Sequence, residues 1–548
     1  MVMNIITQLH TTFSTYLHDS FGYTEPFLFT LNVDETRQGF GDISTNAALL
    51  MAKRLQRSPV DIARQIKEQF DHPTMAKIEV AGPGFLNIYL TTNSFQSLAI
   101  NLFEQKAAFF KPETNPGANR ICIEFVSANP TGPLHFGHGR GGIIGDVLTS
   151  VLRFIGHHAD AEFYINDAGA QIVKLGNSLK IRCQQATGMD IPLPEDAYHG
   201  EYLLPLAQAC ITEYGPSVID KPDSFFQEYA KTKLLERIQQ TLTNFGITFD
   251  TWFSEKTLHE QGLIADALEI LHSRGYLYTH EGALWFASTQ FGDDKDRVVK
   301  KASGELTYVA ADIAYMQDKI NRGYTKLIMI LGHDHHSYVT RLHTVQQALG
   351  LNKYPLDIIL YQLVKMKEDG ELVRMSKRAG NIVTLDDVIE TVGTDVARFF
   401  YLNKKADAQL EFDIALALKH TDENPVYYIQ YAYVRTLSIL QKAAEQVALN
   451  AVSSADAVQL GPDEQLLIKK MVALQTVLND ISNNYQTYLL AQFALELATL
   501  FHQYYSTHRV INLDDVPGSR ARLLLVTLVR NTLETILQLL KISRPERM

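Results

Sequence analysis

The stretch EFVSANPTGPLHFGHGRGGIIGD, residues 124–146, marks the change from strand to helix that decides the fold of the central part of this chain. It overlaps ICIEFVS (121–127), a nearly continuous apolar run that is typical of a buried parallel strand. A loop rich in proline and glycine follows, and GRGGIIGDVLTSVLRFIG (139–156) then opens a helix. This order predicts an α/β domain in which loops at the carboxyl ends of strands carry the chemistry.

The same strand-then-helix pattern continues along the chain. AEFYIND (161–167), KLIMILG (326–332) and LDIILYQLVKM (356–366) are further strand candidates of this buried kind. Residues of about 170–260 form longer helical stretches and are predicted to be an insertion. We therefore expect an α/β domain over residues 111–399.

The regions on either side have a different character. KPETNPGANR (111–120) reads as a linker, and the preceding residues 1–110 mix helical periodicity with short strands such as that in 81–90. After residue 393 strand signals nearly vanish, and amphipathic helices such as 521–542 continue to the end, so 400–548 is predicted to be a helical bundle. Three domains agree with a length of 548 residues.

Composition excludes several classes of protein. With 46% apolar and 20% charged residues the chain is an ordinary globular one, and its net charge of −11 argues against coating nucleic acid through bulk charge, although a local basic groove stays possible. The cysteines, Cys122, Cys183 and Cys210, form no CxxC pair, so neither a disulfide framework nor structural zinc is expected. No basic leader or continuous apolar span is evident, which favours a cytoplasmic protein without a membrane segment.

The glycines of the opening stretch allow two interpretations. Gly137, Gly139 and Gly142 satisfy the dinucleotide-binding pattern G-x-G-x-x-G, and Asp160 follows at about the right distance. That fingerprint needs its first glycine directly after the strand, whereas a longer segment with two prolines intervenes here. The spacing therefore disfavours nicotinamide chemistry.

The second interpretation uses the two histidines. His135 and His138 stand where the loop enters the helix, and Gly137 with Gly139 would let the backbone approach a phosphate at the helix N-terminus. Two imidazoles there would stabilise charge that develops on an attacked α-phosphate. By itself this pattern is also compatible with two surface histidines in a glycine-rich turn.

A second segment with related chemistry lies far downstream. KMKEDGELVRMSKRAGN (365–381) predicts a hairpin around Asp369-Gly370, followed by a basic loop that includes Lys377. Basic side chains on such a loop suit a leaving pyrophosphate, because they meet its charge as it builds up. A charge run alone is usually solvated surface.

Together, HFGH and RMSKR resemble the two signatures of class I aminoacyl-tRNA synthetases, usually written HIGH and KMSKS, in the order that class requires. The longer form EFVSANPTGPLHFGHGR is similar to the arginyl-tRNA synthetase version, and the resemblance covers essentially the whole chain. The further matching segments are FYINDAGAQ (163–171), YHGEY (198–202), FDTWFSE (249–255), LTYVAADIAY (306–315), LGHDHHSYVTRL (331–342), NPVYYIQYAYVR (424–435) and RPERM (544–548).

The resemblance implies a fold and an activity. The fold is a Rossmann-like class I catalytic domain with an N-terminal α/β domain that contacts the tRNA elbow and a C-terminal all-α domain that binds the anticodon. The activity is ATP-dependent formation of arginyl-adenylate from L-arginine, followed by transfer to tRNA(Arg) in protein synthesis, by a cytoplasmic and mostly monomeric enzyme with Mg²⁺ beside ATP and without zinc or DNA. Another class I synthetase, a small-molecule nucleotidyltransferase and a non-catalytic RNA-binding relative remain alternatives.

The resemblance also implies roles for single residues. Asp312 is the expected bidentate partner of the guanidinium with Tyr308 near it, and Glu124 with Asn129 would hold the ammonium and carboxylate end. In family members without the signature lysine a compensating lysine stands upstream of the histidines; here that position is Gly132, and Lys377 is present. The implied catalytic residues are His135, His138 and Lys377; the ATP-binding residues are Gly137, Gly139, Met375, Ser376 and Lys377; and the arginine-binding residues are Glu124, Asn129, His135, Tyr308 and Asp312.

Two further features stay ambiguous at this level. HDHH (333–336) has ligand types that suit a metal, but adjacent side chains diverge, so a loop lining the arginine or adenosine pocket is favoured. Phe501, Tyr504 and Tyr505, near Arg509, would suit stacking on unpaired anticodon bases, although such an aromatic stripe at helical spacing is more often core.

Overall fold

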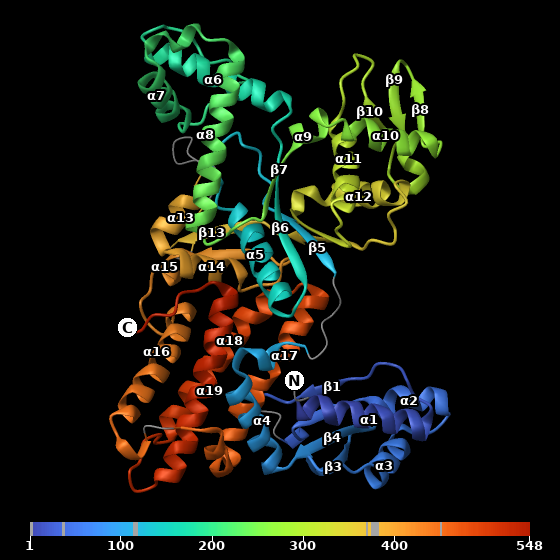
Figure 1. The fold of residues 1–548 in the computed structure, drawn as a ribbon, viewed down its shortest axis with the longest axis vertical. Helices are drawn as coiled ribbons and strands as arrows, with labels where there is room; N and C mark the ends of the chain where they lie inside the picture. The colour runs from blue at the N-terminus through green and yellow to red at the C-terminus, as the bar shows by residue number, and fades with distance from the viewer. Residues whose placement is uncertain (1–3, 35–38, 113–118, 369–370, 374–382, 450–451) are drawn as a thin grey trace.

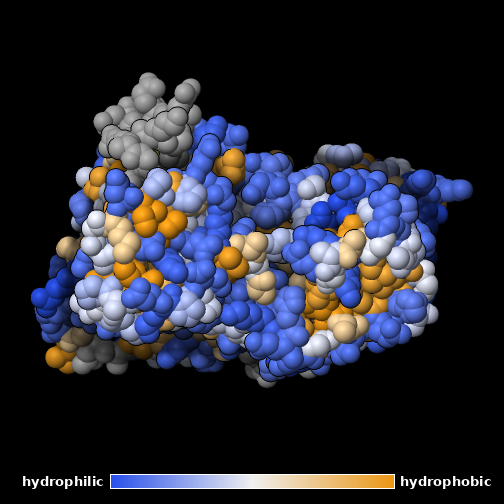
Figure 2. All heavy atoms as spheres, turned by 90° about the horizontal axis from the view of Figure 1, so that it is seen from above, coloured by the Kyte–Doolittle hydropathy of each residue, from blue (hydrophilic) through white to orange (hydrophobic). Residues whose placement is uncertain are grey.

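The computed structural model describes residues 4–34, 39–112, 119–368, 371–373, 383–449 and 452–548. Figure 1 shows a parallel sheet at the centre of the molecule. Two lobes extend from it at one end, and the N-terminal domain and a helical bundle lie at the other. Seen from the side of the two lobes, the surface is mostly hydrophilic, with smaller hydrophobic areas on each (Figure 2).

The central sheet has five parallel strands in the order β12-β11-β5-β6-β7. Its middle strand β5 is the apolar run singled out in the sequence, and all of its residues after the first are buried. Since β5 lies between β11 and β6, the loops after these three strands meet at one edge. The strands are β5 (Arg120–Phe125), β6 (His158–Ile165), β7 (Thr251–Ser254), β11 (Lys326–Gly332) and β12 (Leu356–Tyr361).

Three long helices connect and cover these strands. They are α5 (His138–Phe154), α11 (Tyr308–Asn321) and α12 (His336–Ala348). Helix α5 contains four glycines, a composition that is unfavourable for an isolated helix. Packing explains them: a Cβ on Gly141 would lie 2.6 Å from the Tyr361 ring, and one on Gly145 would lie 2.2 Å from Phe125. Helix α5 is therefore stabilised by close packing against the sheet and not by the intrinsic helix propensity of its residues.

Arg140, in the first turn of α5, anchors the start of that helix. Its guanidinium is fully buried and donates to the carbonyl oxygens of Gln362, Lys405 and Ala408, each at 2.8 Å. These carbonyls belong to segments far downstream, so the helix start is fixed to the part of the domain that follows β12.

Two insertions form the lobes. The first, within the predicted 170–260 region, is helical and has a small core of its own that contains Cys183 and Cys210. The second carries a three-stranded antiparallel sheet, β10-β9-β8, which the sequence analysis did not identify because its strands have only four residues each. The elements are α6 (Ala170–Ala186), α7 (Leu203–Tyr214), η3 (Pro216–Asp220), α8 (Asp223–Asn244), α9 (Glu255–Glu260), α10 (Leu263–Ser273), β8 (Leu277–His280), β9 (Ala283–Phe286), η4 (Ser288–Phe291) and β10 (Arg297–Lys300).

The run 356–366, predicted as one strand, is divided between two sheets. It breaks after Tyr361 and resumes at Val364, and the intervening Leu363 is 65% exposed. The second part is β13, which forms the predicted antiparallel hairpin with β14 and a parallel pair with β15, a strand that the sequence analysis missed. The elements here are β13 (Val364–Glu368), β14 (Glu371–Val373), α13 (Leu385–Val392), α14 (Thr394–Leu402), β15 (Leu410–Asp413) and α15 (Ile414–Ala417).

The N-terminal domain packs helices on an antiparallel four-stranded sheet of order β1-β2-β4-β3. Lys469 of the helical bundle donates to Asp42 of this domain at 2.9 Å, and both side chains are largely buried, so the two parts share an interface. The elements are α1 (Ile5–Phe21), β1 (Phe29–Leu31), β2 (Ile43–Thr45), α2 (Ala47–Leu55), α3 (Pro59–Gln69), β3 (Met75–Ala81), β4 (Phe85–Leu90), α4 (Thr92–Gln105) and η2 (Lys106–Phe110).

The C-terminal part is the predicted helical bundle. Its last helix, α19, is long and apolar enough to cross a membrane, but 72% of its most apolar window is buried inside the protein, as in the core helix of a soluble bundle. At the end of this helix Lys541 meets buried Asp146 of α5 at 2.6 Å, and Arg398 of α14 meets the same carboxylate at 2.6 Å. The elements are α16 (Pro425–Ala444), η6 (Val447–Leu449), η7 (Ser454–Gln459), η8 (Pro462–Glu464), α17 (Gln465–Asn484), α18 (Tyr488–Thr507) and α19 (Val516–Leu540).

Candidate active site

The segment directly after β5 makes a tight turn with an unusual backbone. Val126 and Ser127 both have positive φ, at 67° and 39°, and the Ser127 N–H donates to the Phe125 carbonyl at 2.9 Å. A positive φ is costly for a β-branched residue, and such strain concentrates at functional sites. The turn brings the Ser127 hydroxyl back to Glu124, to which it donates at 3.1 Å, while it accepts from the Tyr164 N–H at 3.1 Å.

The two signature histidines lie together at the start of α5. The ring centroids of His135 and His138 are 3.7 Å apart, and the Gly137 N–H donates to Nδ1 of His135 at 3.1 Å. Burial and the neighbouring His135 lower the pKa of His138 to about 3, and burial lowers the pKa of His135, with Asp334 acting in the opposite direction. Nδ1 of His138 is buried and has no hydrogen-bond partner in the described structure. The pair is therefore neutral at pH 7, and His138 keeps one polar atom free for a ligand.

The two glycines beside the histidines have different surroundings. A Cβ on Gly137 would lie 2.9 Å from the His135 ring, so this glycine permits the histidine pair. A Cβ on Gly139 would lie 2.7 Å from Tyr401 and 2.9 Å from Leu385, which places Gly139 in a helix contact with α14 and α13. The requirement for glycine at Gly139 is thus explained by protein packing.

A second, acidic group lies at the start of α11. Oδ2 of Asp312 is buried and has no hydrogen-bond partner among the described residues, and the same holds for Nε of Arg341. Burial raises the pKa of Asp312 to about 7; the Tyr338 hydroxyl and Arg341 lower it, while Glu255 and Glu124 raise it. An unpaired buried carboxylate is costly. A cationic ligand would supply the missing partner and return the group to its ionised form.

Glu255 is a member of this acidic group that the sequence analysis did not assign. It is buried, and burial raises its pKa, which the Tyr164 hydroxyl partly offsets. The residues on either side of it are fixed by Asp167, which accepts from the Ser254 hydroxyl at 2.8 Å and from the Lys256 N–H at 3.2 Å. Glu255 lies in the matching segment 249–255, which was the available signal, but its role depends on burial beside Tyr164 and Asp312.

The other residues implied for arginine have varied surroundings. Glu124 is buried and forms an ion pair of 2.5 Å with Lys319, an interaction that the sequence did not predict. Asn129 is exposed and donates to Gln171 at 2.9 Å. Tyr308 is 52% exposed, and its hydroxyl would lie 3.1 Å from a Cβ on Gly169. Gly169, at the end of the loop after β6, thus lies next to Tyr308, and Gln171, in the first turn of α6, contacts Asn129.

The HDHH segment follows β11 directly; its first three residues form the short helix η5 (His333–His335), and His336 begins α12. The carboxylate of Asp334 raises the pKa of His135 electrostatically, so the segment lies on the same side of the sheet as the histidine pair. Within the ranges that the structure describes, no group of three or more His, Cys, Asp or Glu side chains is arranged to hold a metal ion. Met375, Ser376 and Lys377 of the second signature lie outside the described residues.

A separate basic hollow of about 730 Å³ lies in the helical bundle. Arg435 spans it, with its guanidinium carbon 4.4 Å from the Tyr431 ring centre and 4.9 Å from that of Tyr505. Tyr505 is 38% exposed. Phe501 and Tyr504 are buried in the core, so these two rings are unavailable for stacking on nucleic-acid bases. The lining residues are Tyr431, Val434, Arg435, Ser438, Ile439, Lys442, Tyr505, Ser506, Thr507, His508, Arg509, Val510, Ile511 and Met548.

The parallel sheet with a histidine pair at its central loop defines the catalytic domain of a class I aminoacyl-tRNA synthetase, and the model of the class I (R) catalytic domain matches residues 101–411. The arginyl-tRNA synthetase N-terminal domain matches residues 7–90, and the DALR anticodon-binding domain matches 429–548. The chain belongs to the arginyl-tRNA synthetase family. An arginine–tRNA ligase of Desulforamulus reducens is 41% identical over 93% of this chain and 92% of its own length.

Solved structures agree with this assignment. A Campylobacter jejuni protein described as an arginyl-tRNA synthetase is 35% identical, with a TM-score of 0.77 over 84% of this chain and all of that one. The Thermus thermophilus arginyl-tRNA synthetase has the same fold, with a TM-score of 0.77 over 99% of both chains at 21% identity. The predicted three-part architecture is confirmed.

Proposed function

We propose that this chain is an arginine–tRNA ligase, which activates L-arginine with ATP and transfers it to the 3′-terminal adenosine of tRNA(Arg). The observation that carries the proposal is the unpaired buried oxygen of Asp312, a carboxyl whose pKa is raised by burial and by the nearby carboxylates of Glu255 and Glu124. A pocket with several carboxylates suits a substrate that is cationic at both ends, and arginine is such a substrate.

The chemistry needs no side-chain nucleophile, because the carboxylate of arginine itself attacks the α-phosphate of ATP. His135 and His138, as neutral imidazoles at the N-terminus of α5, are proposed to stabilise the charge that develops there. Lys377, with Met375 and Ser376, is proposed to act on the pyrophosphate side, and Gly137 on the ATP side with Gly139 packed behind it.

The arginine site is proposed to use both ends of the pocket. Asp312 and Glu255 would receive the guanidinium beside Tyr308, and Glu124, Asn129 and His135 would face the reacting end. Mg²⁺ would enter with the phosphates of ATP, since the described residues offer it no three-ligand site.

The remaining assignments are also proposals. Residues 1–110 would contact the tRNA elbow, 111–399 would carry catalysis, and 400–548 would bind the anticodon, with Tyr505 and Arg435 in the basic hollow as candidates for stacking on unpaired bases. We further propose a cytoplasmic monomer that uses neither zinc nor DNA.

Charging of tRNA with each amino acid in turn tests this function. Arginine alone is expected to be attached; success with another amino acid instead would contradict the specificity, and no charging at all would favour a nucleotidyltransferase. Arginine-dependent exchange of pyrophosphate into ATP is expected to stay near background until tRNA is added, as the family's behaviour implies.

A further inference from the structure

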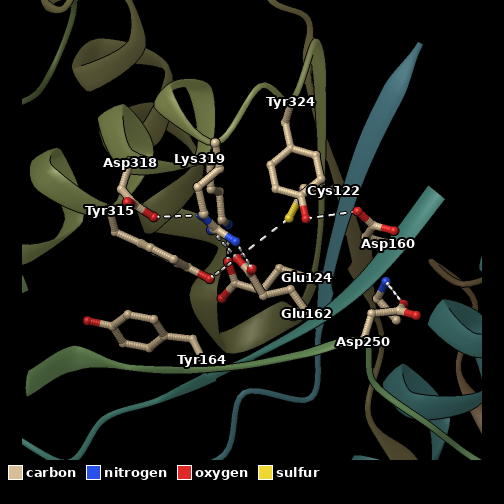
Figure 3. A network of polar contacts seen from close by, with 12 residues as sticks. Cys122, Glu124, Asp160, Glu162, Tyr164, Asp250, Tyr315, Asp318, Lys319 and Tyr324 are labelled. Carbon is tan, nitrogen blue, oxygen red and sulfur yellow. Dashed lines mark hydrogen bonds and ion pairs between the residues drawn. The ribbon is translucent and has the colours of Figure 1, made fainter. Parts of the chain in front are cut away.

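Helix α11 and its C-terminal cap carry a stripe of polar side chains along one face, and three of these side chains contact the central sheet. Residues three and four positions apart share a helix face, and five polar side chains follow this spacing. Asp312 belongs to the acidic group described above. Tyr315, Lys319 and Arg322 contribute to a cluster of polar contacts with strands β5 and β6 (Figure 3). The stripe consists of Tyr308, Asp312, Tyr315, Lys319 and Arg322.

The cluster neutralises two carboxylates that would otherwise repel each other. Glu124 on β5 and Glu162 on β6 are direct neighbours in the register of the parallel strands, and both are buried. Lys319 approaches Glu124 at 2.5 Å, and Arg322 contacts Glu162 through two bonds of 2.5 and 2.9 Å. Each carboxylate thus receives a separate cation from the same helix.

The environment of Lys319 makes this contact a rigid one. The side chain is almost fully buried, and its Nζ lies 4.1 Å from the centre of the Tyr315 ring. The Tyr315 hydroxyl in turn donates to Glu162 at 2.5 Å, so the neighbouring side chain is fixed as well. Burial lowers the pKa of Lys319, but Glu124, Cys122 and Glu162 together raise it by more, so the ammonium stays charged.

The position of this ion pair matters more than its strength, because a buried ion pair contributes little net stability. Lys319 lies on the helix that carries Asp312, and its partner Glu124 lies on β5, one residue before the end of that strand. The two carboxylates proposed to receive the guanidinium and the ammonium of arginine therefore belong to two elements that Lys319 joins directly.

We propose that Lys319 is a positioning residue for substrate selection: by tying α11 to β5 it sets the span between Asp312 and Glu124, and so the length of the dicationic substrate that fits. The inference rests on the proposed function. A side chain longer by one methylene, as in homoarginine, would be rejected because its two charged ends do not meet both carboxylates.

The test is Lys319→Met, which keeps the length of the side chain and removes its charge. Pyrophosphate exchange is measured in the presence of tRNA with arginine and with homoarginine. We expect the KM for arginine to rise about ten-fold or more and the preference for arginine over homoarginine to fall about ten-fold, since one methylene is discriminated by roughly that factor in a shaped pocket. The KM for ATP is expected to change less than about two-fold, because Lys319 supports only the arginine pocket.

Lys469→Met is the matched control, because Lys469 is a similarly buried lysine that pairs with a carboxylate at 2.9 Å, but between the N-terminal domain and the helical bundle. It is expected to leave the amino acid preference unchanged. Lys319→Arg keeps a cation at this position and should retain much of the preference for arginine. If the Met variant does not fold, Lys319→Gln is used in its place, and it too is expected to lower the preference for arginine over homoarginine.

An unchanged preference in a folded, uncharged variant would overturn the proposal, as would an equal rise in the KM for arginine and ATP. These outcomes are distinct from a failure of the proposed function, in which the unmodified protein itself would not charge tRNA with arginine.

Discussion

The clearest consequence of the acidic group around Asp312 is that the affinity for arginine depends on pH. This pH dependence is expected to be absent in Asp312→Asn. Burial raises the pKa of the Asp312 carboxyl to about 7, and the guanidinium requires its ionised form. Because the pKa is raised by burial, ionisation is complete above it and is lost as the pH falls through 7. At pH 6 about one molecule in ten is ionised, so the KM for arginine should be about ten-fold higher at pH 6 than at pH 8.

The size of the loss in Asp312→Asn follows from the same geometry. The substitution removes the charge from a buried partner of the guanidinium and turns one acceptor into a donor, and such changes cost about 3 kcal/mol or more. This corresponds to at least about two orders of magnitude in kcat/KM for arginine. Asp357→Asn serves as a control, because this carboxylate lies on the edge strand β12 and accepts from Tyr485 at 2.6 Å.

The assay is pyrophosphate exchange with saturating ATP and tRNA between pH 5.5 and 8.5. The unmodified protein and the Asp357 variant should share one profile, and the Asp312 variant should be weak at every pH. If the KM of the unmodified protein did not change between pH 6 and 8, or if Asp312→Asn retained the slope, Asp312 would not be the group that pairs with the guanidinium.

Three further predictions concern other parts of the molecule. Since burial holds the pKa of His138 near 3, its ring should remain neutral at pH 5 in histidine-selective NMR, and a ring that protonates near pH 6.5 would contradict the structure. Tyr505→Ala should raise the KM for tRNA several-fold with little change in stability, whereas Tyr504→Ala should destabilise the bundle by about 3–5 kcal/mol in denaturant titration, because only the second ring is buried. Asp146→Asn leaves Arg398 buried without its ion-pair partner and should lower the free energy of unfolding by about 3–5 kcal/mol. A loss below about 1 kcal/mol would mean that this ion pair is not needed for stability.

Much of the fold could be predicted because its signals are local. The run around β5 is nearly continuously apolar, as is typical of a central parallel strand, with Glu124 as its one buried charge. The proline-rich loop and the helix that follow it are also evident from the sequence. The division of 356–366 between two sheets was not predictable in this way, because the break at Leu363 does not interrupt the apolar pattern strongly.

Residues of the candidate site could be predicted where a sequence motif contains them. Residues whose role depends on burial among distant parts of the chain could not. His135 and Asp312 were located by their sequence context, and the structure adds their pKa shifts and unpaired atoms. Lys319 and Glu255 were not foreseen as parts of the site, because a charged residue on a helix is usually solvated. Their function depends on partners from strands and helices distant in the sequence.

The glycines of α5 have a consequence for how the protein is made. A helix with so little intrinsic stability requires its packing partners, and two of these, Tyr361 and Tyr401, lie far later in the chain than the helix itself. During synthesis from the N-terminus, the helix that carries the signature histidines is therefore not stably folded until the second half of the catalytic domain has left the ribosome. An incomplete chain would therefore carry the signature sequence without the packed site.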